Sequence, residues 1–175
     1  ELDGGEAKRI SQSKGTHSIN FSPDSKYFID SYSDANTPTK IALFNAKGKL
    51  VRAIEENVVK AFDEYPYSQK EFFSFKTSDG IELNGWKILP MNFDATKKYP
   101  VLMFVYGGPG SNTVNDTWDR DYMWYQMLCA KGYIIVSVDN RGTGGRGKKF
   151  RDCTYKQLGK FETEDQIEAE NTLAL

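Results

Sequence analysis

Two apolar segments, each ending in a glycine-rich turn, constrain the fold of this chain most strongly. Residues 101–106 form an unbroken apolar run that opens into Gly107-Gly-Pro-Gly110, and residues 133–139 form a second run that opens into Asn140-Arg-Gly-Thr-Gly-Gly-Arg-Gly147. Such runs are typical of buried parallel strands. Open α/β sheets bind their ligands at the carboxyl edge of parallel strands. The sequence therefore predicts an active-site rim formed by these two loops.

The residues between and after these runs predict helices. Residues 121–132 are expected to form the crossover helix that joins the two strands, with Gly132 ending it. The order Thr163-Glu-Asp-Gln166 matches a capping box and predicts the start of a second helix. The three acidic residues Glu162, Glu164 and Asp165 suit the positive end of that helix, so they need no metal ion to explain them.

The first 57 residues have an all-β character. Short alternating runs at 16–21, 27–33, 40–44 and 49–54 are separated by turn residues, including a loop at 34–38. Four antiparallel strands in about fifty residues are the length of one β-propeller blade. One blade cannot bury both of its faces alone, so neighbouring blades are expected to come from elsewhere.

The chain after the blade begins with a connector and a hairpin. Residues 58–70 predict a linker, and residues 71–76 and 81–89 flank an Asp-Gly pair that is typical of a β-hairpin turn. The order of elements resembles the joint between a propeller and an α/β-hydrolase domain. The expected domains are a C-terminal propeller blade at 1–57, the linker, and the first part of the hydrolase domain at 71–175, ending before its nucleophile.

Composition excludes several other classes of protein. The 175 residues carry a formal net charge of −1, which gives no general attraction to nucleic acid or to an anionic membrane. No window approaches the roughly twenty apolar residues of a membrane span. Cys129 and Cys153 are expected to be free thiols, with Cys129 in the core. Nothing in the sequence suggests a cofactor.

A hydrolase of this type needs a nucleophile that the sequence does not contain. Its serine stands in a G-x-S-x-G turn, followed along the chain by an aspartate and a histidine. No serine here has a glycine two positions before it, and the single histidine, His17, falls in the β blade. His17 is therefore predicted to be a half-buried strand residue and not a general base.

Tyr106 is the candidate catalytic residue. In an α/β-hydrolase a hydrogen-bond donor for the oxyanion comes from the loop after the third strand, where Tyr106 stands. A single donor of this kind contributes roughly 3 to 4 kcal/mol to transition-state stabilisation. The alternative is an aromatic residue at a strand end that packs on the crossover helix. The residue pattern leaves both interpretations open.

The second loop allows a different function. Gly142-Thr-Gly-Gly-Arg-Gly147 satisfies the G-x-G-x-x-G pattern of dinucleotide-binding proteins, in which the glycines open a helix that holds a pyrophosphate. Residues 148–152 lack a helical apolar period, however, so no helix is expected after this loop. The glycines are also explained by a tight turn. A non-catalytic module that binds a dinucleotide or another anion through residues 142–147 remains the alternative function.

The ordered motifs resemble one family. Val105-Tyr-Gly-Gly-Pro-Gly110, the segment from Lys131 to Gly147, Leu158-Gly159 and Glu164-Asp-Gln-Ile167 are similar to the dipeptidyl peptidase IV branch of the prolyl oligopeptidase family of serine peptidases. The similarity extends upstream through the linker and the blade. It implies a propeller followed by an α/β-hydrolase domain.

The resemblance also implies an activity. Members release N-terminal dipeptides from peptides, typically after proline or alanine, and Tyr106 matches the tyrosine that lines their oxyanion hole. The family's serine, aspartate and histidine are expected beyond Leu175 and its paired, substrate-binding glutamates before Glu1, so this chain alone is expected to be inactive. Members commonly form homodimers and work outside the cytoplasm, as periplasmic or membrane-anchored enzymes.

Overall fold

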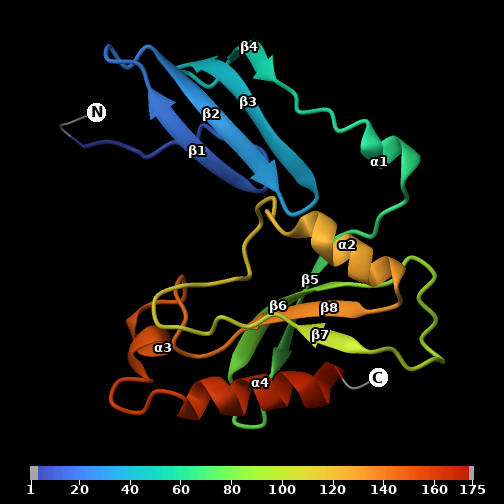
Figure 1. The fold of residues 1–175 in the computed structure, drawn as a ribbon. Coiled ribbons are helices and arrows are strands. Elements are labelled where there is room, and N and C mark those ends of the chain that lie inside the picture. Colours follow the sequence, from blue (N-terminus) through green and yellow to red (C-terminus); the bar gives the residue numbers. More distant parts are fainter. Residues whose placement is uncertain (1–3, 174–175) are drawn as a thin grey trace. The chain divides into compact units, whose positions relative to one another are not determined.

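The computed structural model describes residues 4–173 and contains two compact units (Figure 1). The first comprises the residues up to Asp63 together with Asp116–Asp119, and the second comprises Glu64–Asn115 and the residues from Arg120 onward. The outer boundaries predicted at residues 1 and 175 lie outside the described residues.

The first unit is a four-stranded antiparallel sheet in the order β1-β2-β3-β4. All four expected strands are present. The third begins earlier than predicted, because the loop expected at 34–38 is a two-residue turn in which the Asn36 amide donates to the Asp34 carboxylate at 2.8 Å. The strands are β1 (Thr16–Phe21), β2 (Tyr27–Asp34), β3 (Thr37–Asn45) and β4 (Leu50–Glu55).

The sheet buries little of its apolar surface. Phe28 is buried and stacks on Phe44, with ring centroids 5.3 Å apart. Many other large apolar side chains of the strands remain exposed, among them Ile19, Phe21, Leu50, Val51 and Ile54. Exposed apolar surface of this kind is typical of a face that packs against another element.

Residues 116–119 complete this unit through hydrogen bonds to the strand ends. Asp116 accepts from the Thr16 hydroxyl at 2.7 Å through its backbone carbonyl and from the Ala35 amide at 2.9 Å through its side chain. The Trp118 amide donates to the Ser33 hydroxyl at 3.2 Å. These contacts satisfy polar groups at the β2–β3 turn and at the start of β1. The local sequence pattern did not predict these contacts, because the residues that make them are distant in the sequence.

The second unit is built on a mixed sheet in the order β5-β6-β8-β7. β5 and β6 form the predicted hairpin, β6 pairs antiparallel with β8, and β7 pairs parallel with β8, as the two apolar runs predict. The strands are β5 (Lys70–Lys76), β6 (Glu82–Ile88), β7 (Val101–Met103) and β8 (Ile134–Asp139).

Strand β7 is shorter than the apolar run 101–106 that predicts it. The Phe104 amide still donates to the Val136 carbonyl at 2.8 Å. The next carbonyl of β8 that points the same way is that of Val138, and it accepts from the Gln166 side chain at 2.9 Å. A side chain therefore takes the hydrogen bond that a longer β7 would make.

Two helices pack on opposite faces of this sheet (Figure 1). Val136 and Val138 pack with Ala169 of the C-terminal helix, and Ile135 packs with Tyr125 and Cys129 of the crossover helix. This alternation follows from the two-residue period of a strand. The helices are α2 (Tyr122–Ala130) and α4 (Lys160–Leu173), and two short ones are α1 (Ala61–Glu64) and α3 (Lys148–Asp152). Within residues 4–173 the structure has no helix that is both long and apolar enough to cross a membrane.

Two helix predictions need correction. A helix, α3, does follow the glycine loop, because Phe150 packs against the core from a single turn and no longer period is needed. Helix α4 begins three residues before the predicted capping box. Its first turn is held by the Glu162 carboxylate, which accepts from the Gly159 amide at 3.0 Å, the reciprocal half of a capping box.

The core of the second unit predicts that two leucines contribute very differently to the free energy of unfolding. Leu83 is 0% exposed within the sheet core, whereas Leu158 is 70% exposed. We expect Leu83→Ala to lower the free energy of unfolding by about 2 to 5 kcal/mol, through lost burial and a residual cavity. Leu158→Ala should change it by less than about 0.5 kcal/mol. Urea denaturation followed by tryptophan fluorescence measures both, and equal losses would contradict this core.

Candidate functional site

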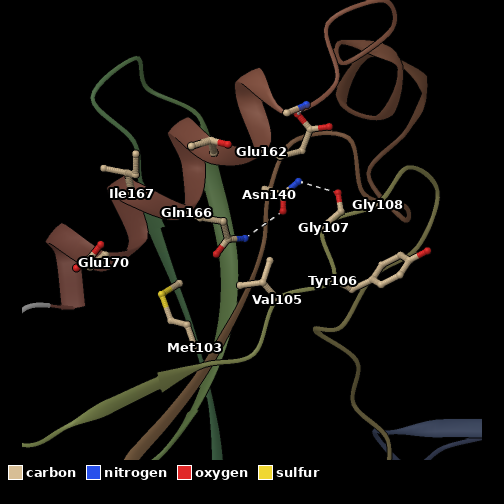
Figure 2. A pocket seen from close by; sticks show the side chains of 12 residues that line it. Met103, Val105, Tyr106, Gly107, Gly108, Asn140, Glu162, Gln166, Ile167 and Glu170 are labelled. Carbon is tan, nitrogen blue, oxygen red and sulfur yellow. Dashed lines mark hydrogen bonds between the residues drawn. The ribbon is translucent and has the colours of Figure 1, made fainter.

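The two glycine-rich loops lie together at the carboxyl ends of β7 and β8. They border a cavity of about 520 Å³ beside helix α4 (Figure 2). The proximity of the loops follows from the parallel pairing of their strands. The residues that line the cavity are Met103, Val105, Tyr106, Gly107, Gly108, Asn140, Gly159, Glu162, Thr163, Gln166, Ile167 and Glu170.

Asp139, the last residue of β8, holds the far end of the loop formed by residues 104–114, called the tyrosine loop below. Its buried carboxylate accepts from the Thr113 amide at 2.7 Å, the Thr113 hydroxyl at 3.0 Å and the Val114 amide at 3.1 Å. The Thr113 hydroxyl also contacts the Ser137 hydroxyl at 2.8 Å. Charge-assisted hydrogen bonds of this kind are among the stronger ones in proteins. The loop is thus fixed seven residues after Tyr106.

Asn140, the next residue, holds the near end of the same loop. Its side-chain amide donates to the Gly107 carbonyl at 3.1 Å and to the Arg141 carbonyl at 2.6 Å. Its side-chain oxygen accepts from the Gln166 amide at 3.0 Å. Figure 2 shows this connection from helix α4 through Asn140 to the residue that follows Tyr106.

Backbone hydrogen bonds join the two loops between these anchors. The Gly110 amide donates to the Gly142 carbonyl at 3.2 Å, and the Gly144 amide donates to the Ser111 carbonyl at 3.0 Å. A Cβ atom on Gly144 would lie 3.0 Å from the Gly110 carbonyl oxygen. Glycine at position 144 therefore permits the close approach of the two backbones.

Arg141 ties the second loop to helix α4 through a buried ion pair. The Asp165 carboxylate accepts from the Arg141 backbone amide at 2.6 Å, from Nε at 2.9 Å and from Nη2 at 2.6 Å. The guanidinium also reaches Asp79 at 2.8 Å and lies over the Phe161 ring. Hydrogen bonding to Asp165, opposed by burial, raises the pKa of Arg141. The arginine therefore stays charged.

Tyr106 itself is the exposed part of this otherwise fixed region. Its side chain is 69% exposed, and Figure 2 shows its ring pointing away from Gln166. Phe104, and not Tyr106, approaches the crossover helix, with its ring centroid 6.4 Å from that of Tyr125. A Cβ atom on Gly108 would lie 2.6 Å from the Tyr106 ring, so the glycine leaves room for the ring. A hydroxyl on such a loop is available to a ligand.

Three amides at the start of the glycine loop 142–147 are used within the protein. The Gly142 amide donates to the Phe150 carbonyl at 3.0 Å, and the Thr143 amide donates to the Asn140 carbonyl at 3.3 Å. The Gly144 amide is also taken, as described above. The Arg146 guanidinium donates to the Glu82 carbonyl. A pyrophosphate site needs free amides, so these three amides are not available to a dinucleotide.

The other residues considered for catalysis or metal binding have structural roles. His17 is a half-buried residue of β1 whose Nδ1 lies 2.7 Å from an Asp30 carboxylate oxygen, as the strand interpretation predicts. Cys129 lies in the core, and burial raises the pKa of its thiol to about 11. Among the described residues, no group of three His, Cys, Asp or Glu side chains could hold a metal ion.

Known proteins are similar to this chain along most of its length. Residues 120–174 match the sequence profile of the Prolyl oligopeptidase family. The chain is 38% identical over 175 residues to a probable dipeptidyl-aminopeptidase B of Podospora anserina, covering 97% of this chain and 19% of that protein. It is 37% identical over 157 residues to dipeptidyl peptidase 4 of Arthroderma otae, covering 86% of this chain and 20% of that protein.

Solved structures of dipeptidyl peptidases are also similar to this chain. Porphyromonas gingivalis dipeptidyl peptidase 4 matches with a TM-score of 0.88 and 44% identity, over 94% of this chain and 24% of its own. A putative dipeptidyl aminopeptidase IV of Bacteroides ovatus matches with a TM-score of 0.81 and 33% identity, over 91% of this chain and 23% of its own. The resemblance to the dipeptidyl peptidase IV branch of the prolyl oligopeptidase family, predicted from the sequence, is confirmed. The chain spans about a fifth of the length of its curated relatives.

Sequence reasoning missed the residues that support the tyrosine loop. The sequence pattern places Asp139 at the end of the apolar run, Asn140 and Arg141 in the glycine-rich turn, and Asp165 and Gln166 at a helix start. One signal was present, because three consecutive polar residues at and just after the end of an apolar strand need partners when that strand is buried. The partners come from residues 107, 113 and 165, and their distance along the chain hides them from a local pattern.

The buried ion pair predicts different effects for two neighbouring acidic residues. Asp165 is 0% exposed beside Arg141, whereas Glu164 is half exposed and 4.0 Å from the same guanidinium. We expect Asp165→Asn to lower the free energy of unfolding by about 3 kcal/mol, because it removes the buried carboxylate of the pair and leaves the Arg141 guanidinium with two half-exposed carboxylates, those of Asp79 and Glu164. Glu164→Gln should cost less than about 1 kcal/mol. Urea denaturation tests this, and a similar cost for both variants would refute the assignment.

Proposed function

We propose that this chain is part of a serine-type dipeptidyl peptidase, an exopeptidase that releases N-terminal dipeptides after proline or alanine through an acyl-enzyme. In this proposal residues 1–57 are the last blade of a β-propeller, residues 58–70 a linker, and residues 71–175 the first part of an α/β-hydrolase domain. The observation that supports it most is the exposed Tyr106 hydroxyl on a loop that is otherwise held in place. Similarity to dipeptidyl peptidases along nearly the whole chain gives independent support.

The proposed role of Tyr106 is to donate a hydrogen bond to the oxyanion. When a serine attacks the scissile carbonyl, negative charge develops on the carbonyl oxygen, and a donor that is already in position stabilises it without reorganisation. The phenol of Tyr106 provides such a donor, and the anchors on Gly107 and Thr113 hold its loop before substrate binds. The nucleophile and its base are expected from parts of the protein outside residues 1–175. A homodimer is the expected assembly of the whole enzyme.

Removing the phenol hydroxyl tests this role. In the full-length protein we expect Tyr106→Phe to lower kcat for a dipeptide substrate by roughly a hundredfold, because a single oxyanion donor is lost. Tyr155→Phe is the matched control, since Tyr155 is also well exposed and lies outside the cavity. Its kcat should be unchanged. Steady-state kinetics measures both, and an unchanged kcat for Tyr106→Phe would return Tyr106 to a packing role.

The proposal also predicts the behaviour of the isolated chain. An oxyanion donor without a nucleophile cannot form an acyl-enzyme. A fluorophosphonate probe should therefore label no serine of residues 1–175, while it labels the full-length protein at one site. Mass spectrometry after labelling gives the answer. Stoichiometric labelling of a serine within this chain would contradict the proposal.

A further inference from the structure

We propose that Asn140 is a positioning residue, whose side-chain amide holds the Gly107 carbonyl and thereby aims the Tyr106 hydroxyl. This inference rests on the proposed function of Tyr106. It adds a residue that touches neither substrate nor the reacting atoms, and a second one, Gln166, that orients it. The three residues come from three separate segments of the chain, the tyrosine loop, the end of β8 and helix α4 (Figure 2).

The chemistry of the Asn140 side chain fits this role. Asn140 is 0% exposed, and its amide uses a donor and an acceptor at once. Its NH₂ group donates to the Gly107 carbonyl, and its oxygen accepts from Gln166. An aspartate has the same shape but cannot donate when ionised. The position therefore requires an amide, and a carboxylate would face the Gly107 carbonyl with like partial charges.

Gln166 fixes which way the Asn140 amide is turned. The Gln166 NH₂ group lies 2.9 Å from the Val138 carbonyl and 3.0 Å from the Asn140 side-chain oxygen, two acceptors that only a donor can satisfy. Its own oxygen is buried and lacks a partner among the described residues. The two donated bonds therefore set the orientation of Gln166. This orientation in turn points the Asn140 NH₂ group at Gly107.

The contact acts directly on the peptide next to Tyr106. Gly107 has a φ of +67°, and a Cβ atom there would lie 2.7 Å from the Asn140 side-chain oxygen. The Asn140 amide thus packs against the glycine backbone as well as bonding to it. Since Tyr106 is largely exposed and has few contacts of its own to hold it, the backbone at Gly107 determines where its hydroxyl lies. Loss of this anchor should reduce the time that the hydroxyl is correctly placed.

The expected kinetic signature is a loss of kcat with little change in KM. The oxyanion exists only in the transition state, so a misplaced donor weakens transition-state binding and leaves substrate binding intact. A displacement of an ångström can cost orders of magnitude in rate. A partial loss of order is expected to cost less than complete removal of the hydroxyl.

A double-mutant cycle in the full-length protein tests the inference. We expect Asn140→Asp to lower kcat roughly tenfold with KM within about twofold of the wild type. In the Tyr106→Phe background the same substitution should change kcat by less than about twofold, because the hydroxyl that it positions is already gone. A further tenfold loss in that background, or no loss in the wild-type background, would overturn the inference.

Two additional variants separate the inference from charge and folding effects. Asn92→Asp, at an exposed position of the same unit, adds the same charge and should leave kcat unchanged. Gln166→Met removes the orienting donor without adding charge, and it should lower kcat only when Tyr106 is present. This variant provides the test if Asn140→Asp does not fold. An equal loss with and without the Tyr106 hydroxyl would again overturn the inference.

The same experiments distinguish failure of the inference from failure of the proposed function. If Tyr106→Phe leaves kcat unchanged, the proposed role of Tyr106 is wrong, and the positioning role falls with it. If Tyr106→Phe lowers kcat and the Asn140 and Gln166 variants do not, the oxyanion role stands and only the positioning role is refuted.

Discussion

The complete burial of strand β8 is the constraint on which the rest of the second unit depends. All six of its residues are buried between two helices, so the strand end cannot turn its polar groups to water. A buried polar group without a partner costs free energy, and three polar residues stand in succession here: Asp139 and Asn140, which are buried, and Arg141, whose side chain is 11% exposed. Each is satisfied by a different segment. Asp139 bonds to the end of the tyrosine loop, Asn140 to its start and Arg141 to helix α4.

In the proposed function, the contacts of these three residues serve both folding and catalysis. The polar residues that close the core also fix the loop that carries Tyr106, and the backbone bonds at Gly110 and Gly144 hold it between its two anchors. An oxyanion donor is effective only when it is in place before the reaction. An exposed tyrosine on a held backbone meets this requirement. The first unit differs from the second in its packing, because its sheet leaves apolar side chains exposed on its strands.

The parts of the structure that depend on local pattern were predictable from the sequence. The four-strand sheet, the hairpin, the parallel pair and the crossover helix follow from apolar period and turn residues, and the motif order indicated the family. The parts of the structure that depend on residues distant in the sequence could not be predicted. Strand β7 is short because Gln166 takes a carbonyl of β8, and α4 begins at Lys160 because Glu162 caps Gly159. The role of Asp165 as an ion-pair partner could be recognised only once the structure placed Arg141 beside it. The catalytic assignment of Tyr106 rests on the family resemblance and on its exposure.

We propose that the Tyr106 hydroxyl bonds to the oxyanion from a loop already in position. A crystal structure of the full-length protein with a peptide boronic acid tests this most directly, because the tetrahedral boronate on the serine imitates the intermediate. We predict a boronate oxygen roughly 2.6 to 3.0 Å from the Tyr106 hydroxyl, with the Asn140–Gly107 bond unchanged between the free and inhibited forms. A boronate oxygen bonded elsewhere, with the Tyr106 hydroxyl facing solvent, would contradict the claim.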